Sequence, residues 1–204
     1  MKTPFRYQAT DFDCVPTTFI NALQYLFDRS EIPPAVIQKI MLYSLDTVNK
    51  YGEHGKRGTT GLSIQLILQW LESFQDDKFS FKRCEYLPRE QIHLRQGNKI
   101  MSCMNKGGVA LLRVSNRKTS NTLFHYLLAL GVDDNDSDWL LFFDPYYRVQ
   151  QFKGEDSNYL EWLGDNSRQG ANLRIKRERL DSYEYEKYSM ASIDERECCL
   201  LERK

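Results

Sequence analysis

The first third of the chain carries apolar residues at spacings of three and four positions, which is typical of helices with one buried face. Three helices are expected here, over residues 14–27, 33–45 and 62–74. Pro16 falls in the first turn of the first helix, where a missing N–H does no harm, so that helix is expected to begin near Cys14. Residues 51–61 contain four glycines and predict a loop, after which Thr59 or Thr60 can cap the third helix.

From residue 78 onward the pattern changes to short alternating or apolar runs, which is typical of strands. Strands are expected over residues 78–86, 109–114, 123–132, 139–143, 149–153, 172–179 and 197–202, with short helices over 88–96 and 157–163. The runs 123–132 and 139–143 are apolar on both faces and are joined by a polar segment, so they predict a central hairpin. Helices followed by antiparallel strands predict an α+β fold, with residues 1–204 forming one domain.

Composition and charge narrow the classes of partner. The 28 Lys and Arg residues are balanced by 28 Asp and Glu residues, so no positive field is available to hold a nucleic-acid backbone or an anionic membrane. No apolar run is long enough to span a bilayer, and the first residues lack the apolar stretch of a secretory signal. We therefore expect no nucleic-acid partner and no membrane association, while the oligomeric state stays undetermined.

The five cysteines and three histidines bear on the compartment and on metal binding. An odd cysteine count without a C-x-x-C pair is typical of a reducing compartment, which predicts a cytoplasmic protein. The histidines, at positions 54, 93 and 125, have no ligand spacing, so no metal or other cofactor is expected.

Cys14 is the first candidate for chemistry because it stands at the expected start of a helix. The positive end of the helix dipole favours the thiolate, which is the nucleophilic form of cysteine. Position alone is weak support, since a buried cysteine more often only packs. Cys84, Cys103, Cys198 and Cys199 have no comparable setting and are expected to be structural.

His125 differs from His54 and His93 because it lies in an otherwise apolar strand, where an imidazole needs a partner. Asp144 ends the following strand of the predicted hairpin, and antiparallel pairing brings it back toward His125. The carboxylate can then hold one ring nitrogen and leave the other as a base. The alternative is a buried His–Asp hydrogen bond that serves stability only.

Gln8 stands six residues before Cys14, a spacing that allows its amide to fold back over the cysteine. Together with the backbone N–H of Cys14, this amide can form an oxyanion hole for acyl transfer. A glutamine alone carries little weight, but the order Gln8, Cys14, His125, Asp144 is a more specific pattern.

Three segments of the chain resemble the motifs of papain-like cysteine peptidases. They are Gln8-Ala-Thr-Asp-Phe-Asp-Cys-Val-Pro-Thr-Thr18, Phe124-His-Tyr-Leu-Leu-Ala-Leu-Gly-Val132 and Phe143-Asp-Pro-Tyr146. They are most similar to the bacterial double-glycine leader peptidases attached to bacteriocin exporters and to their stand-alone relatives. The resemblance covers roughly residues 5–150 and leaves 151–204 as an extension of the same domain.

The resemblance implies a papain-like fold in which Cys14 is the nucleophile and His125 the general base and acid. It further implies Asp144 as the orienting residue and Gln8 as the oxyanion donor. Val15 replaces the usual glycine after the cysteine; the backbone donor is unaffected, but this side chain can narrow the cleft. The loop 51–61 is either a lid over that cleft or an exposed connector.

The expected function is that of a cysteine hydrolase, a peptidase that cleaves a peptide or protein segment. The same residues allow an acyltransferase, a transglutaminase-like enzyme or a deamidase, because an amine can resolve an acyl-enzyme as water does. A non-catalytic papain-like domain that binds a peptide is the third possibility.

Overall fold

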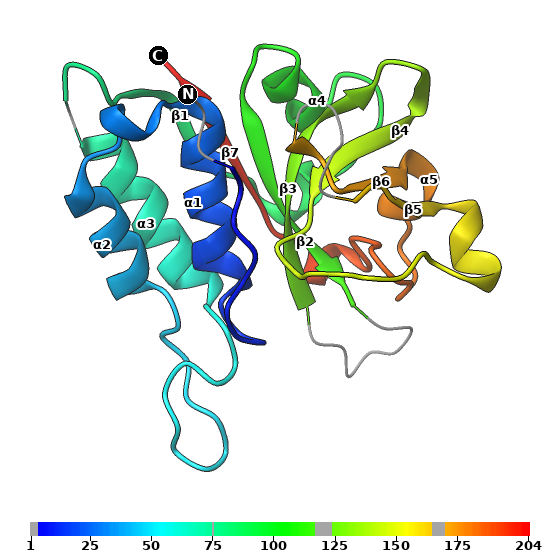
Figure 1. Ribbon diagram of the computed structural model, residues 1–204, viewed down its shortest axis with the longest axis horizontal. Helices are drawn as coiled ribbons and strands as arrows, with labels where there is room; N and C mark the ends of the chain where they lie inside the picture. Colours follow the sequence, from blue (N-terminus) through cyan, green and yellow to red (C-terminus); the bar gives the residue numbers. More distant parts are fainter. Residues whose placement is uncertain (1–3, 75, 117–123, 165–169) are drawn as a thin grey trace.

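The computed structural model describes residues 4–74, 76–116, 124–164 and 170–204 and has an α+β architecture (Figure 1). The helices of the described chain are α1 (Cys14–Leu26), α2 (Pro34–Tyr43), α3 (Gly61–Ser73), α4 (Lys99–Met104) and α5 (Arg177–Leu180). The strands are β1 (Phe81–Tyr86), β2 (Val109–Ser115), β3 (Phe124–Asp133), β4 (Asp136–Phe143), β5 (Leu160–Trp162), β6 (Leu173–Lys176) and β7 (Cys198–Arg203). The predicted α+β class is thus confirmed.

The seven strands form one antiparallel sheet in the order β1-β7-β2-β3-β4-β6-β5. The expected hairpin is present as β3 and β4, in the interior of the sheet, although Leu123 lies outside the described residues. The last strand, β7, lies between β1 and β2, so the C-terminal segment is built into the sheet.

Each face of the sheet carries its own core, because alternate residues of a strand point to opposite faces. In β2, Leu111 belongs to the core that also contains residues of α1, α2 and α3, while Leu112 belongs to the core that contains residues of α4 and α5. Figure 1 shows α1, α2 and α3 together on one side of the molecule. This two-sided burial is why β2, β3 and the second half of β4 are mostly apolar.

Helix α1 is buried along nearly its whole length and is tied to its surroundings by polar side chains. Thr18 Oγ1 donates to the carbonyl of Tyr126 in β3 at 3.2 Å. Asn21 donates to the Arg6 carbonyl at 2.9 Å and accepts from the Arg6 N–H at 2.8 Å. These bonds place the start of α1 beside the start of β3 and hold the N-terminal segment along the helix.

Several expected boundaries in the first half are wrong. Helix α2 ends at Tyr43 rather than at residue 45, and Leu45 has a φ of 57°, outside the helical range. The strand expected over 78–86 begins only at Phe81. The helix expected over 88–96 is a 3₁₀ turn at Arg89–Gln91, whereas α4 was not expected at all. Short helices of this kind show too few apolar repeats to be recognised.

The expected elements of the last third also need correction. Residues 149–153 form no strand, and the helix expected over 157–163 is a 3₁₀ turn at Gly154–Asn158 followed by β5. The strand expected over 172–179 ends at Lys176 and is followed directly by α5. The tertiary contacts of these short segments override their weak local preferences.

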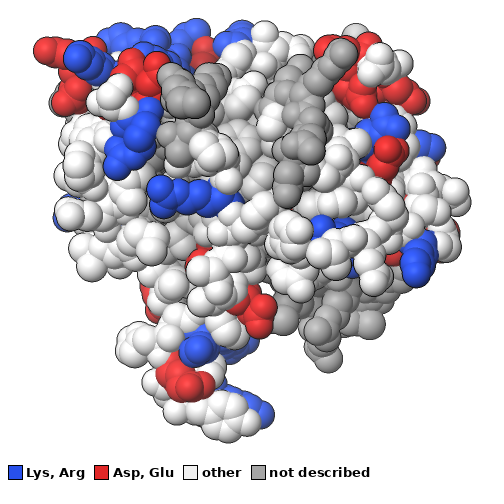
Figure 2. Space-filling model, in the orientation of Figure 1, with Lys and Arg blue, Asp and Glu red and all other residues white. Residues whose placement is uncertain are grey.

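On the face shown in Figure 2, basic and acidic side chains are interspersed rather than gathered by sign. This distribution accords with the balanced composition of the chain. Among the helices of the described ranges, none is long and apolar enough to cross a membrane.

Candidate active site

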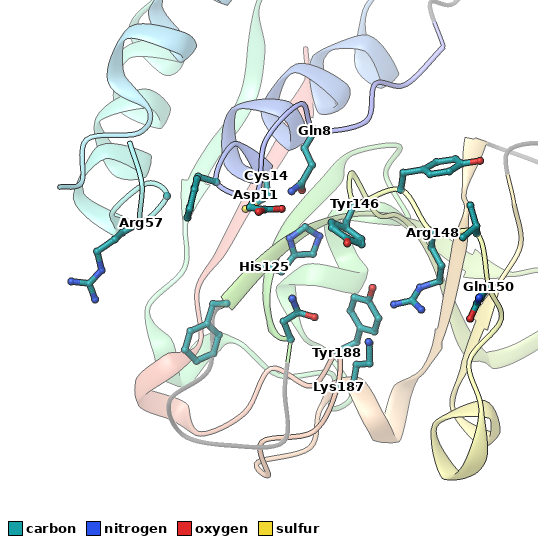
Figure 3. Close-up of a pocket in the computed structure, with 16 residues that line it drawn as sticks. Gln8, Asp11, Cys14, Arg57, His125, Tyr146, Arg148, Gln150, Lys187 and Tyr188 are labelled. Carbon is teal, nitrogen blue, oxygen red and sulfur yellow. The ribbon is translucent and has the colours of Figure 1, made fainter. Parts of the chain in front are cut away.

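Cys14 and His125 lie close together where α1 and β3 begin (Figure 3), and Asp144 is bonded to His125. The Cys14 side chain lies beside the His125 ring and favours its protonated form. On the other side of the ring, Nε2 of His125 lies 2.6 Å from Oδ1 of Asp144. Because Nε2 is engaged by Asp144, Nδ1 is the ring nitrogen left for the thiol. The predicted His–Asp hydrogen bond is therefore confirmed.

The hairpin register explains why Asp144 reaches His125. Leu128 pairs with Phe143, so the same register continued by one residue would set Asp144 opposite Leu127. His125 is two residues from Leu127 on the same strand face, and diagonal neighbours across antiparallel strands are within reach of each other. The strand pairing predicted from the two apolar runs thus positions Asp144 beside His125.

Asp144 is fully buried, and its carboxylate accepts three hydrogen bonds. Oδ1 accepts from His125 Nε2 and from the backbone N–H of Tyr146 at 2.8 Å, and Oδ2 accepts from the Tyr188 hydroxyl at 2.5 Å. A buried carboxylate with this many donors is held in one orientation. The orientation of the His125 ring is fixed in turn.

The surroundings of His125 favour its protonated form. Burial alone would lower the pKa of this imidazole, but the charge and hydrogen bond of Asp144, with a smaller contribution from Cys14, raise the pKa to about 10. At neutral pH the ring is therefore an imidazolium beside the sulfur. An imidazolium in this place stabilises a neighbouring thiolate.

Gln8 lines the same cleft as Cys14 and His125. Its backbone N–H donates to the Pro145 carbonyl at 2.8 Å, which ties it to the residue after Asp144. Its side-chain Nε2 donates to the Thr10 carbonyl at 2.8 Å, and Oε1 is buried without a hydrogen-bond partner in the described structure. In Figure 3 the Gln8 side chain extends toward Cys14, and one of its amide N–H groups is held by Thr10.

The turn between Gln8 and Cys14 is held by Asp13. Its carboxylate accepts from the N–H groups of Ala9 at 3.0 Å and Thr10 at 2.8 Å, and from the Thr10 hydroxyl at 2.9 Å. The first backbone hydrogen bond of α1 runs from the Thr17 N–H to the Asp13 carbonyl. The Cys14 N–H therefore comes before the first N–H group that is bonded within the helix. An N–H in that position has no acceptor within its helix.

The cleft extends to both sides of Cys14. The larger part has a volume of about 640 Å³ and the smaller part about 450 Å³, and Cys14, Arg57, Gly58 and Phe124 line both. Val15 is only 2% exposed and packs in the core, although it also lines the smaller part. Its side chain therefore leaves the larger part of the cleft open.

The loop at 51–61 contributes to the cleft only through its base. Arg57 and Gly58 line the walls, whereas Tyr51 near the tip is 76% exposed, and the loop extends away from the body of the molecule in Figure 1. In this conformation the tip is an exposed connector.

Two residues of the C-terminal segment complete the site and were not found from the sequence. Asn172 accepts from the Asp144 N–H at 2.7 Å and donates to the Asp144 carbonyl at 2.9 Å. Tyr188, whose hydroxyl holds Asp144, has a φ of 60°, a strained value for a tyrosine. It directly follows the charge-dense segment 174–187. No local pattern in that segment points to Tyr188.

The remaining cysteines and histidines lie away from the cleft lining. Burial raises the pKa of the Cys103 thiol to about 11 and holds the pKa of the other three thiols, at positions 84, 198 and 199, above its ordinary range. His54 is exposed in its loop, and His93 accepts from the N–H of Arg95 at 3.3 Å. In the part of the chain that the structure describes, no three His, Cys, Asp or Glu side chains are grouped to hold a metal ion.

Comparison of the chain with protein-family models, with curated proteins and with solved structures found no match. The function is therefore inferred from the side chains of the cleft.

Proposed function

We propose that this protein is a papain-like cysteine hydrolase that cleaves a peptide or protein segment. The observation that carries the proposal is the unbroken contact from Cys14 through His125 to Asp144 at the wall of an open cleft. A nucleophile, a base and an orienting carboxylate in this order are the requirements for acyl transfer by cysteine.

In the proposed reaction, the Cys14 thiolate attacks the carbonyl carbon of the scissile amide and the carbonyl oxygen becomes an oxyanion. The Cys14 N–H and the Gln8 amide donate to that oxygen. His125 then gives its proton to the leaving amine as the C–N bond breaks, which leaves a thioester. Water, deprotonated by His125, hydrolyses the thioester and restores the thiol.

The shape of the cleft supports a chain-like substrate. A peptide that places its scissile carbonyl at Cys14 must extend to both sides of the nucleophile, and the cleft continues on both sides. The smaller side is lined by the carboxyl group of Glu197, which accepts from Tyr126, and by Arg113. The mixed polar lining suits a peptide backbone, which presents both donors and acceptors.

Alkylation kinetics test the proposal directly. With iodoacetamide at neutral pH, Cys14 should react at least about tenfold faster than any of the other four cysteines, because it alone lies beside an imidazolium in an open cleft. Site-resolved mass spectrometry measures the five rates. Cys14→Ala should abolish cleavage of a random peptide pool, whereas the matched variant Cys103→Ala should keep it.

Equal alkylation of Cys14 and the buried cysteines, with unchanged turnover in Cys14→Ala, would overturn the proposal. Product masses separate the alternative reactions. A gain of one water across a cut peptide bond indicates hydrolysis. A peptide fragment joined to an added amine indicates acyl transfer, and a mass gain of about 1 Da at a glutamine side chain indicates deamidation.

A further inference from the structure

Two cationic side chains, Arg148 and Lys187, stand at one end of the larger part of the cleft. In Figure 3 both extend toward the space beside Tyr188, while Arg57 points outward at the opposite end. Both side chains are partly buried. Arg148 also interacts with Tyr188, whose hydroxyl group donates to Asp144.

The two cations have no anionic partner of their own. Neither lies within ion-pair distance of a carboxylate among residues 4–74, 76–116, 124–164 and 170–204, and the Arg148 Nε is buried without a hydrogen-bond partner there. Arg148 instead lies over the ring of Phe152, 4.3 Å from its centre, and the Lys187 ammonium lies 5.8 Å from the same ring. An aromatic face holds cations in place without neutralising them.

The acidic groups closest to this pair already have partners. Asp144 is bonded to His125 and Tyr188, and Asp156 lies 2.9 Å from Arg179. Burial lowers the pKa of Lys187, and the charge of Arg148 lowers it further, while Asp156 and Asp144 offset part of that effect. Two like charges in a partly buried place have an energetic cost that a bound anion would relieve.

We propose that Arg148 and Lys187 form a subsite that binds a carboxylate of the peptide substrate. The inference rests on the proposed peptidase function, because it assigns the cleft to a peptide. A carboxylate fits the pair better than a neutral group, since a guanidinium presents paired donors and an ammonium adds a point charge. Either the side chain of an acidic residue or the terminal carboxylate of the peptide supplies this chemistry.

Binding to an inactive variant tests the subsite apart from catalysis. The Cys14→Ala protein is equilibrated with synthetic pools of N-acetylated hexapeptides, made as free acids and as C-terminal amides, with Glu or Gln at each position. Bound peptides are quantified by mass spectrometry. Carboxylate-bearing peptides should be enriched about tenfold or more, as expected for a charge-assisted hydrogen bond of about 1.5–3 kcal/mol.

The two pools identify the source of the carboxylate. Enrichment of Glu peptides in the amide pool indicates a side-chain carboxylate, and enrichment of free acids regardless of Glu indicates the terminal one. Adding Arg148→Gln and Lys187→Gln should remove the preference. Lys153→Gln, which alters an exposed cation outside the cleft lining, should retain it, and so should the charge-conserving Lys187→Arg.

The subsite is refuted if acidic and neutral peptides bind equally, or if the preference survives the double substitution. Such a result leaves the proposed hydrolase function intact wherever Cys14-dependent cleavage is observed. Conversely, a carboxylate preference without any Cys14-dependent cleavage would reject the hydrolase and retain the anion-binding subsite.

Discussion

Asp144 is held by hydrogen bonds to both its side chain and its backbone. Its carboxylate accepts from His125, Tyr146 and Tyr188, and Asn172 holds its backbone on both sides. Because this side chain is fully buried, its charge acts on His125 with little screening by water. Asp144 is therefore the main neighbour that favours the protonated imidazole.

The raised pKa of His125 sets the direction of the pH dependence. An unfolded chain has a histidine pKa of about 6.5, so the stability that the imidazolium contributes is fully present below that pH. That contribution is lost as the pH rises toward about 10, the folded pKa. The activity proposed above should decline over the same alkaline range, because the leaving amine needs the His125 proton.

Asp144→Asn should shift the alkaline limit of activity to lower pH. Removing the carboxylate charge removes the main group that raises the His125 pKa, and kcat/KM should also fall roughly 10²–10⁴-fold. The measurement is kcat/KM against pH for the wild type and the variant. Asp138→Asn, at an exposed position of the same hairpin, is the matched control. An unchanged alkaline limit in Asp144→Asn would show that Asp144 does not control His125.

At the scale of elements, the site is formed where one helix start meets one strand start. Cys14 opens α1 and His125 is the second residue of β3, so the distance between sulfur and ring depends on how α1 lies against β3. Thr18 connects the two elements through the Tyr126 carbonyl. This bond lies one helical turn from Cys14 and one residue from His125.

Thr18→Val should weaken both stability and activity. Loss of the hydrogen bond to the Tyr126 carbonyl should lower the free energy of unfolding by about 0.5–1.5 kcal/mol. It should also slow the alkylation of Cys14, because α1 is less firmly placed against β3. The control is the same change at Thr17, which is also buried in α1. Equal alkylation rates in the two variants would mean that the Thr18 bond does not position the nucleophile.

At the scale of the whole molecule, β7 contributes side chains to both cores. Leu200 and Leu201 are fully buried on opposite faces of the sheet, and β7 pairs with both β1 and β2. The C-terminal segment also supplies Tyr188 and Asn172 to the cleft. The described residues of 151–164 and 170–204 thus contribute strands to the sheet and side chains that support the site.

Leu200→Ala should destabilise the whole fold. Removing a fully buried leucine side chain from a central strand should cost about 2–5 kcal/mol of unfolding free energy. Leu62→Ala, at a position that is 78% exposed, should change it by less than about 0.5 kcal/mol. Urea titration followed by circular dichroism measures both values. If Leu200→Ala lowered the free energy of unfolding as little as Leu62→Ala, the interior position of β7 between β1 and β2 would be contradicted.

The sequence by itself determined the features that are encoded locally. The start of α1 followed from helical spacing and the position of Pro16, and the β3–β4 hairpin followed from two apolar runs with a short polar connector. The hairpin register then predicted the contact between His125 and Asp144, which are only 19 positions apart. Local patterns of this kind are visible because backbone geometry repeats along the chain.

Only the tertiary structure decided which distant residues complete the site. Asn172 and Tyr188 reach Asp144 across 28 and 44 positions, and Arg148 and Lys187 meet at one end of the cleft through the same folding of the C-terminal segment. These contacts depend on strand order and on the non-repetitive path of residues 177–197, which no periodicity encodes. The physical reason is that the spacing of apolar side chains along the sequence determines which face of a helix or strand is buried. Tertiary packing determines which of these faces contact one another.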